Sequence, residues 1–314
     1  MNNVILITVD TLRKDMVGFY QNPQLASFTP FLDTLKAGTV LFEHAYSCGP
    51  YTQAAFPAII SSAYFLEHGR QKKLPRENTL VSEVLQREGV KTAGFHSNPY
   101  LSYFFGYNRG WDMFYDSMQD DVSKLYPFVR GGVINRKVGV WLDSFVKKGA
   151  DTPLFLWVHY MDVHEPYIAA EKYLAEVDPS LTLSKEQMFG LYKEVLLQRD
   201  CSNPETVQVL ASLYRAKVLE TDGYIKSLFR IFSELGVLDD SIIIVTSDHG
   251  EEFAEHGGLS HDGKMVPELI NVPLFVYGSD KISSGNRITR AVSSADIPPT
   301  ILDLFGIEIP PAYR

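Results

Sequence analysis

The sequence has little cysteine, with only Cys48 and Cys201 among its 314 residues. Two cysteines cannot build the disulfide framework of a small secreted scaffold, so we expect two reduced thiols. Long apolar runs are also lacking, because no segment reaches the ~18 apolar residues that a membrane-spanning helix requires. No signal peptide precedes the first apolar segment, which starts at Val4. The sequence therefore predicts a cytoplasmic protein without a transmembrane segment.

Positive charge is scarce as well. The 29 Lys and Arg residues are outnumbered by 38 Asp and Glu residues, which gives a formal net charge of −9. This balance excludes nonspecific binding to nucleic acid, and a chain that binds an anionic substrate needs a local source of positive charge. Apolar residues make up 45% of the sequence. The chain can therefore bury a large core, and we expect a single domain over residues 1–314.

Apolar runs alternate with segments of helical character along the chain. We expect strands at 4–9, 40–42, 92–96, 154–159, 242–246 and 274–277, and helices at 29–37, 80–88, 205–235 and 297–304. This alternation predicts an α/β fold with a mostly parallel central sheet flanked by helices. The segments 119–150 and 169–204 match no regular pattern, and we expect them to form helical insertions over the functional site.

Polar side chains follow two of the predicted strands. The run 4–9 stops at Asp10, and the run 242–246 is followed by Ser247, Asp248 and His249. On its own, an Asp-His-Gly sequence after a strand is equally consistent with a turn. If the two strands are neighbours in a parallel sheet, however, Asp10, Asp248 and His249 converge at its carboxyl edge. Mixed carboxylate and imidazole ligands suit a divalent cation, so the pattern predicts a metal site.

A hydroxyl group lies between these two strands in the sequence. The turn-like segment 48–52 leads into the helical segment 53–60, which places Thr52 at the predicted N-cap and Pro57 near the first turn. As a cap, Thr52 would be worth about 1 kcal/mol. A helix N-terminus also favours negative charge, and a cation-bound hydroxyl there would lose its proton readily and act as a nucleophile. The spacing alone does not separate these two roles.

Further segments accompany these residues in a fixed order. They are 10–13 (Asp-Thr-Leu-Arg), 29–35 (Thr-Pro-Phe-Leu-Asp-Thr-Leu), 50–52 (Pro-Tyr-Thr), 157–167 (ending in Met-Asp-Val-His-Glu-Pro-Tyr), 246–251, 256–257, 272–274 and 295–304. Together they resemble the sulfatase branch of the alkaline phosphatase superfamily over nearly the whole chain. The resemblance implies an alkaline phosphatase-like three-layer sandwich, and we expect this chain to lack the small C-terminal subdomain that many members add.

The resemblance also implies roles for individual residues. One divalent cation, which we expect to be Mn²⁺ rather than Ca²⁺, Mg²⁺ or Zn²⁺, would be held by Asp10, Thr52, Asp248 and His249. Thr52 would be the catalytic nucleophile, His261 would protonate the leaving oxygen, and His164 would contact the ester oxygens. The substrate-binding residues would be Arg13, Lys264 and His159, although His159 at a strand end could also be a core histidine. We expect Glu251, Glu252 and Glu255 to form a solvated acidic turn.

The sequence departs from the family at the nucleophile. Formylglycine sulfatases carry a Cys-x-Pro-Ser-Arg motif whose Cys or Ser is oxidised, whereas here Thr52 is followed by Gln53, Ala54, Ala55 and Phe56. Threonine cannot become formylglycine, and Cys48 is not followed by such a motif. A metal-bound threonine instead resembles the family's phospho-group hydrolases and lipid-headgroup transferases.

We therefore predict a metal-dependent hydrolase that cleaves a phosphate- or sulfate-type ester, glycan- or lipid-linked, through Thr52. One alternative is a phospho-headgroup transferase acting on lipid or glycan, which would need a pocket for a second alcohol. Another is a noncatalytic sulfatase-like binding protein, suggested by the lost Pro-Ser-Arg motif. The retention of Asp10, Thr52, Asp248 and His249 argues against this last alternative.

Overall fold

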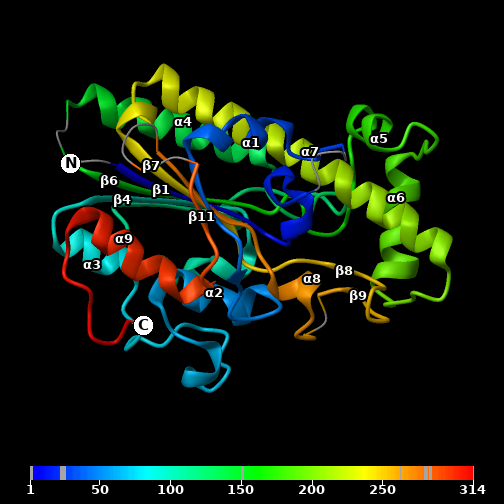
Figure 1. The fold of residues 1–314 in the computed structure, drawn as a ribbon, viewed down its shortest axis with the longest axis horizontal. Helices are drawn as coiled ribbons and strands as arrows, with labels where there is room; N and C mark the ends of the chain where they lie inside the picture. Colours follow the sequence, from blue (N-terminus) through cyan, green and yellow to red (C-terminus); the bar gives the residue numbers. More distant parts are fainter. Residues whose placement is uncertain are drawn as a thin grey trace.

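The computed structural model describes residues 3–21, 26–149, 152–261, 263–278, 282 and 285–313. Its centre is an eight-stranded sheet with the order β11-β2-β10-β7-β1-β6-β4-β5 (Figure 1). The strands are β1 (Asn3–Val9), β2 (Thr39–Phe42), β4 (Lys91–His96), β5 (Met113–Asp116), β6 (Leu154–Tyr160), β7 (Ser241–Ser247), β10 (Leu274–Tyr277) and β11 (Arg287–Ile288). Neighbouring strands from β7 to β5 are parallel, and β10 runs antiparallel to both β7 and β2. The predicted α/β fold with a mostly parallel sheet is confirmed.

The apolar runs explain why β1, β6 and β7 occupy the centre of the sheet. Every residue of β6 and β7 is buried, and so is every residue of β1 after Asn3. Leu6 in β1 lies opposite Trp157 in β6 and Ile244 in β7, so large apolar side chains line up across the three strands. Strands that are buried on both faces are typical of a parallel sheet covered by helices on both sides.

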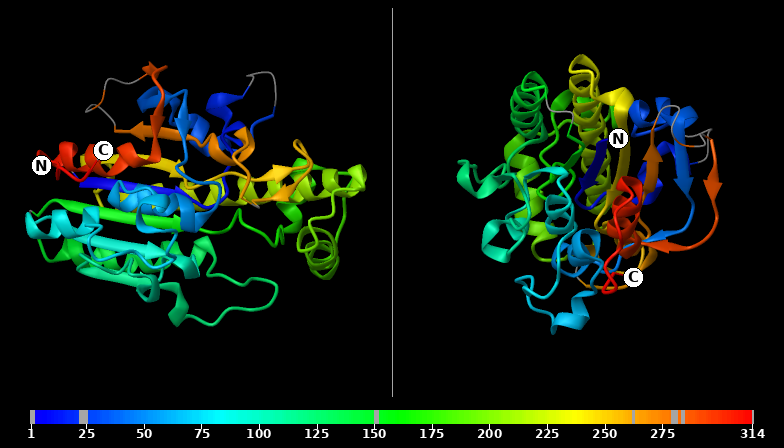
Figure 2. Two further views of the ribbon diagram at one scale, coloured as in Figure 1. Left: turned by 90° about the horizontal axis from the view of Figure 1, so that it is seen from below. Right: turned by 90° about the vertical axis from the view of Figure 1, so that its left-hand side faces the viewer.

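Helices cover the two faces of the sheet as separate layers (Figures 1 and 2). One layer contains α1 (Pro30–Thr34), α4 (Gly131–Lys147) and α7 (Pro204–Glu234), and the other contains α2 (Thr52–Ser61), α3 (Val81–Arg87) and α9 (Ile297–Phe305). The buried apolar side chains form one cluster under each layer. None of the helices in the described ranges has the length and apolar character that crossing a bilayer requires.

The two segments without a sequence pattern both contain helices. Within 119–150, α4 packs against β4, β6 and α7 and so belongs to a layer that covers the sheet. Within 169–204 the chain forms α5 (Glu171–Val177), α6 (Lys185–Leu191) and a π-helical turn, η8 (Tyr192–Leu196). This second segment projects beyond the carboxyl ends of the central strands (Figure 2).

Short elements complete the fold. Two-stranded sheets pair β3 (Ala45–Tyr46) with β12 (Val292–Ser293) and β8 (Glu252–Phe253) with β9 (Leu259–Ser260), and α8 (Pro267–Ile270) precedes β10. The 3₁₀ turns are η1 (Lys14–Met16), η2 (Gly18–Tyr20), η3 (Lys36–Gly38), η4 (Phe65–His68), η5 (Pro99–Leu101), η6 (Tyr103–Phe105), η7 (Ser117–Gln119), η9 (Leu238–Asp240) and η11 (Ser294–Asp296).

Candidate active site

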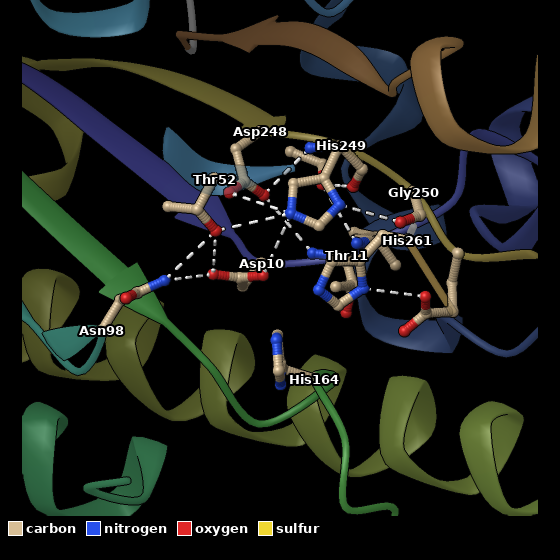
Figure 3. A network of polar contacts seen from close by, with 12 residues as sticks. Asp10, Thr11, Thr52, Asn98, His164, Asp248, His249, Gly250 and His261 are labelled. Carbon is tan, nitrogen blue, oxygen red and sulfur yellow. Dashed lines mark hydrogen bonds and ion pairs between the residues drawn. The ribbon is translucent and has the colours of Figure 1, made fainter. Parts of the chain in front are cut away.

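The pairing register of β1 and β7 brings the predicted metal ligands together. Val9 at the end of β1 lies opposite Ser247 at the end of β7. Asp10 and Asp248 each follow by one residue, so their carboxylates emerge side by side at the carboxyl edge (Figure 3). The Ser247 hydroxyl donates to the Val9 carbonyl over 2.7 Å and fixes the two chain ends relative to each other. This edge of a parallel sheet is where open α/β folds place ligands.

Asp10, Asp248 and His249 form a compact group of ligand atoms. Nε2 of His249 lies 3.6 Å from Oδ1 of Asp10 and 3.5 Å from Oδ2 of Asp248. All three residues are fully buried, and one ligand atom from each lies within 4.8 Å of the others. Oxygen and nitrogen donors at this spacing can share one divalent cation.

Two carboxylate oxygens of this group have no hydrogen-bond partner among the described residues. They are Oδ1 of Asp10 and Oδ2 of Asp248, both buried, and an unsatisfied buried polar atom costs about 1–3 kcal/mol, or more when it is charged. Burial and the neighbouring Asp10 carboxylate raise the pKa of Asp248 to about 8. Burial also tends to raise the pKa of Asp10, but its hydrogen bond to His159 and the charges of nearby histidines lower that pKa below its usual value. A bound cation would satisfy both orphaned oxygens, so these residues fit the implied metal.

Thr52 begins α2 but does not cap it. The N-cap is Tyr51, whose backbone is extended and whose carbonyl accepts from the amides of Ala54 and Ala55 over 2.9 and 3.0 Å. The prediction of Thr52 as N-cap is therefore wrong, because helical hydrogen bonding starts one residue earlier than the side-chain types suggest. Pro57 also lies inside α2 and not in its first turn. The Thr52 hydroxyl is consequently free of any capping role.

The Thr52 hydroxyl faces the carboxylate group instead (Figure 3). Its Oγ1 lies 3.3 Å from Oδ2 of Asp10 and 3.4 Å from Nε2 of His249, and the residue is 5% exposed. The first turn of α2 adds the partial positive charge of a helix N-terminus at this point. The structure therefore brings the four predicted metal-site residues together.

Asn98 is a member of the site that the sequence interpretation missed. Its Nδ2 donates to Oδ2 of Asp10 over 2.7 Å and lies 3.3 Å from Oγ1 of Thr52. Asn98 follows β4 by two residues, so the rule that found Asp10 and Asp248 at strand ends would also have pointed to it.

His159 lies against the Asp10 carboxylate. Nε1 of Trp157 donates to the Thr8 hydroxyl over 3.0 Å, and this hydroxyl is hydrogen-bonded to Nδ1 of His159 over 2.8 Å. The other ring nitrogen, Nε2, lies 3.4 Å from Oδ2 of Asp10. His159 is fully buried, and in this structure its partners are Thr8 and Asp10.

Two further histidines, His164 and His261, lie beside the predicted metal ligands. The ring of His261 lies 4.7 Å from that of His249 and 4.9 Å from that of His164, between ring centroids. Nδ1 of His261 lies 3.0 Å from Oε1 of Glu251, and Oε2 of Glu251 accepts from the Tyr167 hydroxyl over 2.6 Å. Burial lowers the pKa of His261 well below its usual value, helped by the two neighbouring imidazoles. Burial tends to lower the pKa of His164 too, but the charges of Asp10 and Glu165 raise it above the usual value.

The prediction of a solvated acidic turn is wrong for Glu251 and Glu252, whereas Glu255 is exposed as expected. Glu251 and Glu252 are fully buried. Oε1 of Glu252 accepts from the amides of His256 and Gly258 over 3.0 and 2.9 Å, which compensates its burial. The acidic residues that follow Gly250 do not reveal their hydrogen-bond partners in the sequence. The partners of Glu252 come from the β8–β9 hairpin, and that of Glu251 is Tyr167.

Arg13 and Lys264 are paired with carboxylates of this hairpin region. Arg13 lies 2.7 Å from Asp15 and 2.5 Å from Glu255, and it also donates to the Glu251 carbonyl over 3.1 Å. Lys264 lies 3.3 Å from Oε2 of Glu252. The charge of each predicted substrate-binding cation is thus already balanced within the protein.

The turn after β1 is strained. Thr11 has a left-handed backbone with φ of 57°, which costs of order 1–3 kcal/mol for a residue other than glycine. The Thr11 carbonyl accepts from the Tyr214 hydroxyl over 2.7 Å, and its amide lies 3.4 Å from Oδ1 of Asp248. Strain held by such contacts is typical of functional sites.

Comparison with known proteins adds independent evidence. A family model described as Sulfatase matches residues 2–307. An arylsulfatase of Clostridium perfringens is 23% identical over 98% of this chain and 76% of its own length. Arylsulfatase K of Bos taurus is 34% identical over 98% of this chain and 63% of its own length. The solved structure of a phosphonate monoester hydrolase of Agrobacterium radiobacter has a TM-score of 0.72 at 17% identity, covering 98% of this chain and 74% of that one, which shows the shared fold.

The match extends over almost the whole chain and includes both strand ends that carry the site. It confirms the resemblance to the sulfatase-like branch and the predicted class of sulfuric or phosphoric ester hydrolases. Members of this family use a divalent metal, which agrees with the buried carboxylate and imidazole group. The chain belongs to the sulfatase family.

Proposed function

We propose that this chain is a metal-dependent hydrolase that cleaves a phosphate- or sulfate-type ester with Thr52 as the nucleophile. The observation that carries the proposal is the position of Oγ1 of Thr52, 3.3 Å from Asp10 and 3.4 Å from His249 at the start of a helix. A divalent cation held by Asp10, Asp248, His249 and Thr52, for which Mn²⁺ is the favoured candidate, would lower the pKa of the hydroxyl and neutralise an ester oxygen.

The residues around Thr52 suit an in-line displacement. Oγ1 of Thr52 releases its proton to solvent and forms the new bond to phosphorus or sulfur, and the bond to the leaving oxygen breaks, which gives a covalent threonyl ester. Nδ1 of His261 faces Glu251 over 3.0 Å, which leaves Nε2 to donate a proton to the leaving oxygen. Burial lowers the pKa of His261 in the free protein, so this role requires the charge of the bound ester anion to raise that pKa. Water then attacks the threonyl ester and regenerates the hydroxyl. His164, whose pKa is raised above its usual value, offers positive charge to the transferred group.

The nucleophile favours phosphate-type esters over sulfate esters. A formylglycine hydrate expels sulfate by collapsing back to its aldehyde, whereas a threonyl sulfate has no such exit and needs direct attack of water at sulfur. The structural likeness to a phosphonate monoester hydrolase is consistent with this preference. Because relatives of this chain are arylsulfatases, any assay must compare phosphate-type esters with sulfate esters.

The decisive experiment is a substrate panel followed by mass spectrometry. Aryl phosphate, phosphodiester, phosphonate monoester and aryl sulfate are each assayed with Mn²⁺, Mg²⁺, Ca²⁺ and Zn²⁺. We expect the fastest turnover for a phosphate or phosphonate ester, and a phosphoryl or phosphonyl adduct on the peptide that contains Thr52. Fastest turnover of aryl sulfate would overturn the preference, and an adduct mapped to another residue would overturn the nucleophile.

A further inference from the structure

A patch of exposed apolar side chains lies on the loops next to the candidate site. Five large apolar side chains there are between 43% and 68% exposed. They are Leu66, Tyr100, Tyr103, Phe104 and Met118, which we call the mouth patch. Apolar side chains that gather on neighbouring loop tips are typical of an interaction surface, because leaving them in water is unfavourable.

Hydrogen bonds connect the mouth patch directly to the candidate metal site. Oδ1 of Asn98 accepts from the Tyr100 amide over 2.8 Å, while Nδ2 of the same side chain donates to Asp10 over 2.7 Å. The side chain that positions Asp10 therefore also fixes the start of η5. The loop that carries Tyr100 is thus joined to Asp10 through one side chain.

Further contacts fix the other loops that carry mouth-patch side chains. The buried Asp116 carboxylate accepts from the amides of Tyr103 and Met118 over 2.8 and 3.0 Å, which joins η6 to η7. The Phe65 ring packs edge-on against Tyr51, the N-cap of α2, at 6.2 Å between centroids. The η4 segment, which carries Leu66, thus borders the start of α2 and lies at the lower edge of the molecule in Figure 1.

The segment 70–76 adds positive charge beside the patch. It carries four exposed basic side chains and no acidic one, namely Arg70, Lys72, Lys73 and Arg76. Nζ of Lys72 lies 5.8 Å from the centroid of the Tyr100 ring. The amide of Leu74 donates to the Phe105 carbonyl over 3.0 Å, so this basic segment is joined to η6. Such a concentration of cations stands out on a chain with a net charge of −9.

We propose that the mouth patch and the basic segment 70–76 together bind an anionic phospholipid bilayer. Exposed Leu, Phe and Tyr side chains at loop tips gain free energy when they enter the headgroup and acyl boundary, and nearby Lys and Arg side chains attract anionic headgroups. The strength of peripheral binding grows with the apolar area that is buried and with the attraction to anionic lipids, and both contributions are available here. The bound protein would hold the loops beside the candidate site at the bilayer surface.

The composition of the patch distinguishes a bilayer from a soluble polyanion. An acidic polysaccharide would use the four cations and the flat aromatic rings, but it would gain little from Leu66 and Met118. A bilayer uses both the aliphatic and the aromatic side chains. The proposal concerns binding alone, so its test does not depend on turnover at Thr52.

The test is flotation of the intact chain with vesicles. We expect binding to vesicles of phosphatidylcholine mixed with phosphatidylglycerol, weaker binding as ionic strength rises, and little binding to phosphatidylcholine alone. Each basic side chain near an anionic surface strengthens binding about fivefold, so the double variant Lys72→Gln, Lys73→Gln should bind about 25-fold more weakly. Phe104→Ser should weaken binding at least about tenfold through lost apolar burial.

Matched controls come from α4, on the other face of the sheet. Lys147→Gln with Lys148→Gln removes the same charge, and Val140→Ser removes an apolar side chain that is 76% exposed. Both controls should bind vesicles like the parent chain, and circular dichroism should show all variants folded because every changed side chain is exposed. Three results would each overturn the proposal: no binding to anionic vesicles, equal losses in the α4 controls, or retention on heparin without retention on vesicles.

Discussion

Two buried polar clusters at the carboxyl end of the sheet differ in how well they are satisfied. One is the candidate site around Asp10 and Asp248. The other, which we call the Lys217 cluster, contains Arg130, Asp162, Lys217 and Glu220, in which Asp162 follows β6 by two residues. Both clusters contain carboxylates that are buried almost completely, so burial alone does not distinguish them.

The Lys217 cluster balances its own charge. Lys217 lies 2.6 Å from Glu220, and Arg130 pairs with Glu220 and, over 3.1 Å, with Asp162. Asp162 also accepts from the Gly131 amide over 2.7 Å at the start of α4. Two cations face two carboxylates, and among the described residues no side-chain atom of this cluster is buried without a partner. Such a network fixes the positions of α4, α7 and β6 and needs no ligand.

The candidate site has the opposite balance. Two carboxylates face imidazoles, and in the described part of the chain one oxygen of each carboxylate has no hydrogen-bond partner. The nearby cations Arg13 and Lys264 are paired elsewhere. A functional polar cluster is thus recognised by the charge it still requires. Opposite predictions therefore follow for the two clusters.

The largest expected effect is on turnover at the candidate site. Thr52→Ala removes the attacking oxygen, and turnover should fall at least about a thousandfold. Thr52→Ser keeps the hydroxyl and should retain part of the activity. Because Thr52 does not cap α2, the free energy of unfolding should change by less than about 1 kcal/mol in urea denaturation. Turnover of Thr52→Ala close to that of the parent chain would remove Thr52 from the mechanism.

The next largest effect is on the stability of the Lys217 cluster. Lys217→Met leaves Glu220 and Asp162 with Arg130 as their single cationic partner, and the free energy of unfolding should fall by about 3–5 kcal/mol. Metal content, measured by elemental analysis, should not change. Lys226→Met on the exposed side of the same helix is the control, and it should alter stability by less than about 0.5 kcal/mol. A comparable loss in both variants would show that the buried network is not the cause.

The sequence predicted the first cluster and missed the second for a physical reason. Apolar runs that end in Asp10 and Asp248 locate a sheet edge, because parallel strands end on the same side. The Lys217 cluster depends on the crossing of α4 and α7, and the segment that contains α4 showed no regular pattern. From the sequence alone, charged residues within a long helix are expected to face solvent. Their burial is apparent only when the helix that covers them is known.

The same reason explains the residues missed within the site. Asn98 follows the predicted strand 92–96, so its position after a strand could have assigned it to the site. The burial of Glu251 could not be predicted, since its partners Tyr167 and His261 are 84 and 10 residues away in the sequence. The N-cap was misplaced because Tyr51 caps α2 through its backbone and not through its side chain.

A smaller effect separates the two clusters by their response to metal. Saturation with a divalent cation at about 100 times its Kd should stabilise the parent chain by about 2.7 kcal/mol. Asp248→Asn should lose this gain and retain no metal in elemental analysis. Asp162→Asn, which changes a carboxylate of the Lys217 cluster, should keep both the metal and the gain despite its lower stability. Stoichiometric metal in Asp248→Asn would contradict the ligand assignment.

The last effect appears in the metal-free protein as a dependence on pH. Burial and the Asp10 carboxylate raise the pKa of Asp248 from 3.8 to about 8, so the folded state holds a proton that the unfolded state releases. The stabilisation from this proton is fully present below about pH 4 and is lost as pH rises towards 8. Asparagine carries no such proton. In the presence of a chelator, the difference in unfolding free energy between Asp248→Asn and the parent chain should therefore shift steadily in favour of the variant between pH 4 and 8. A difference that stays constant across this range, measured by urea denaturation, would show that Asp248 is already ionised in the metal-free fold and that its orphaned oxygen is tolerated without a cation.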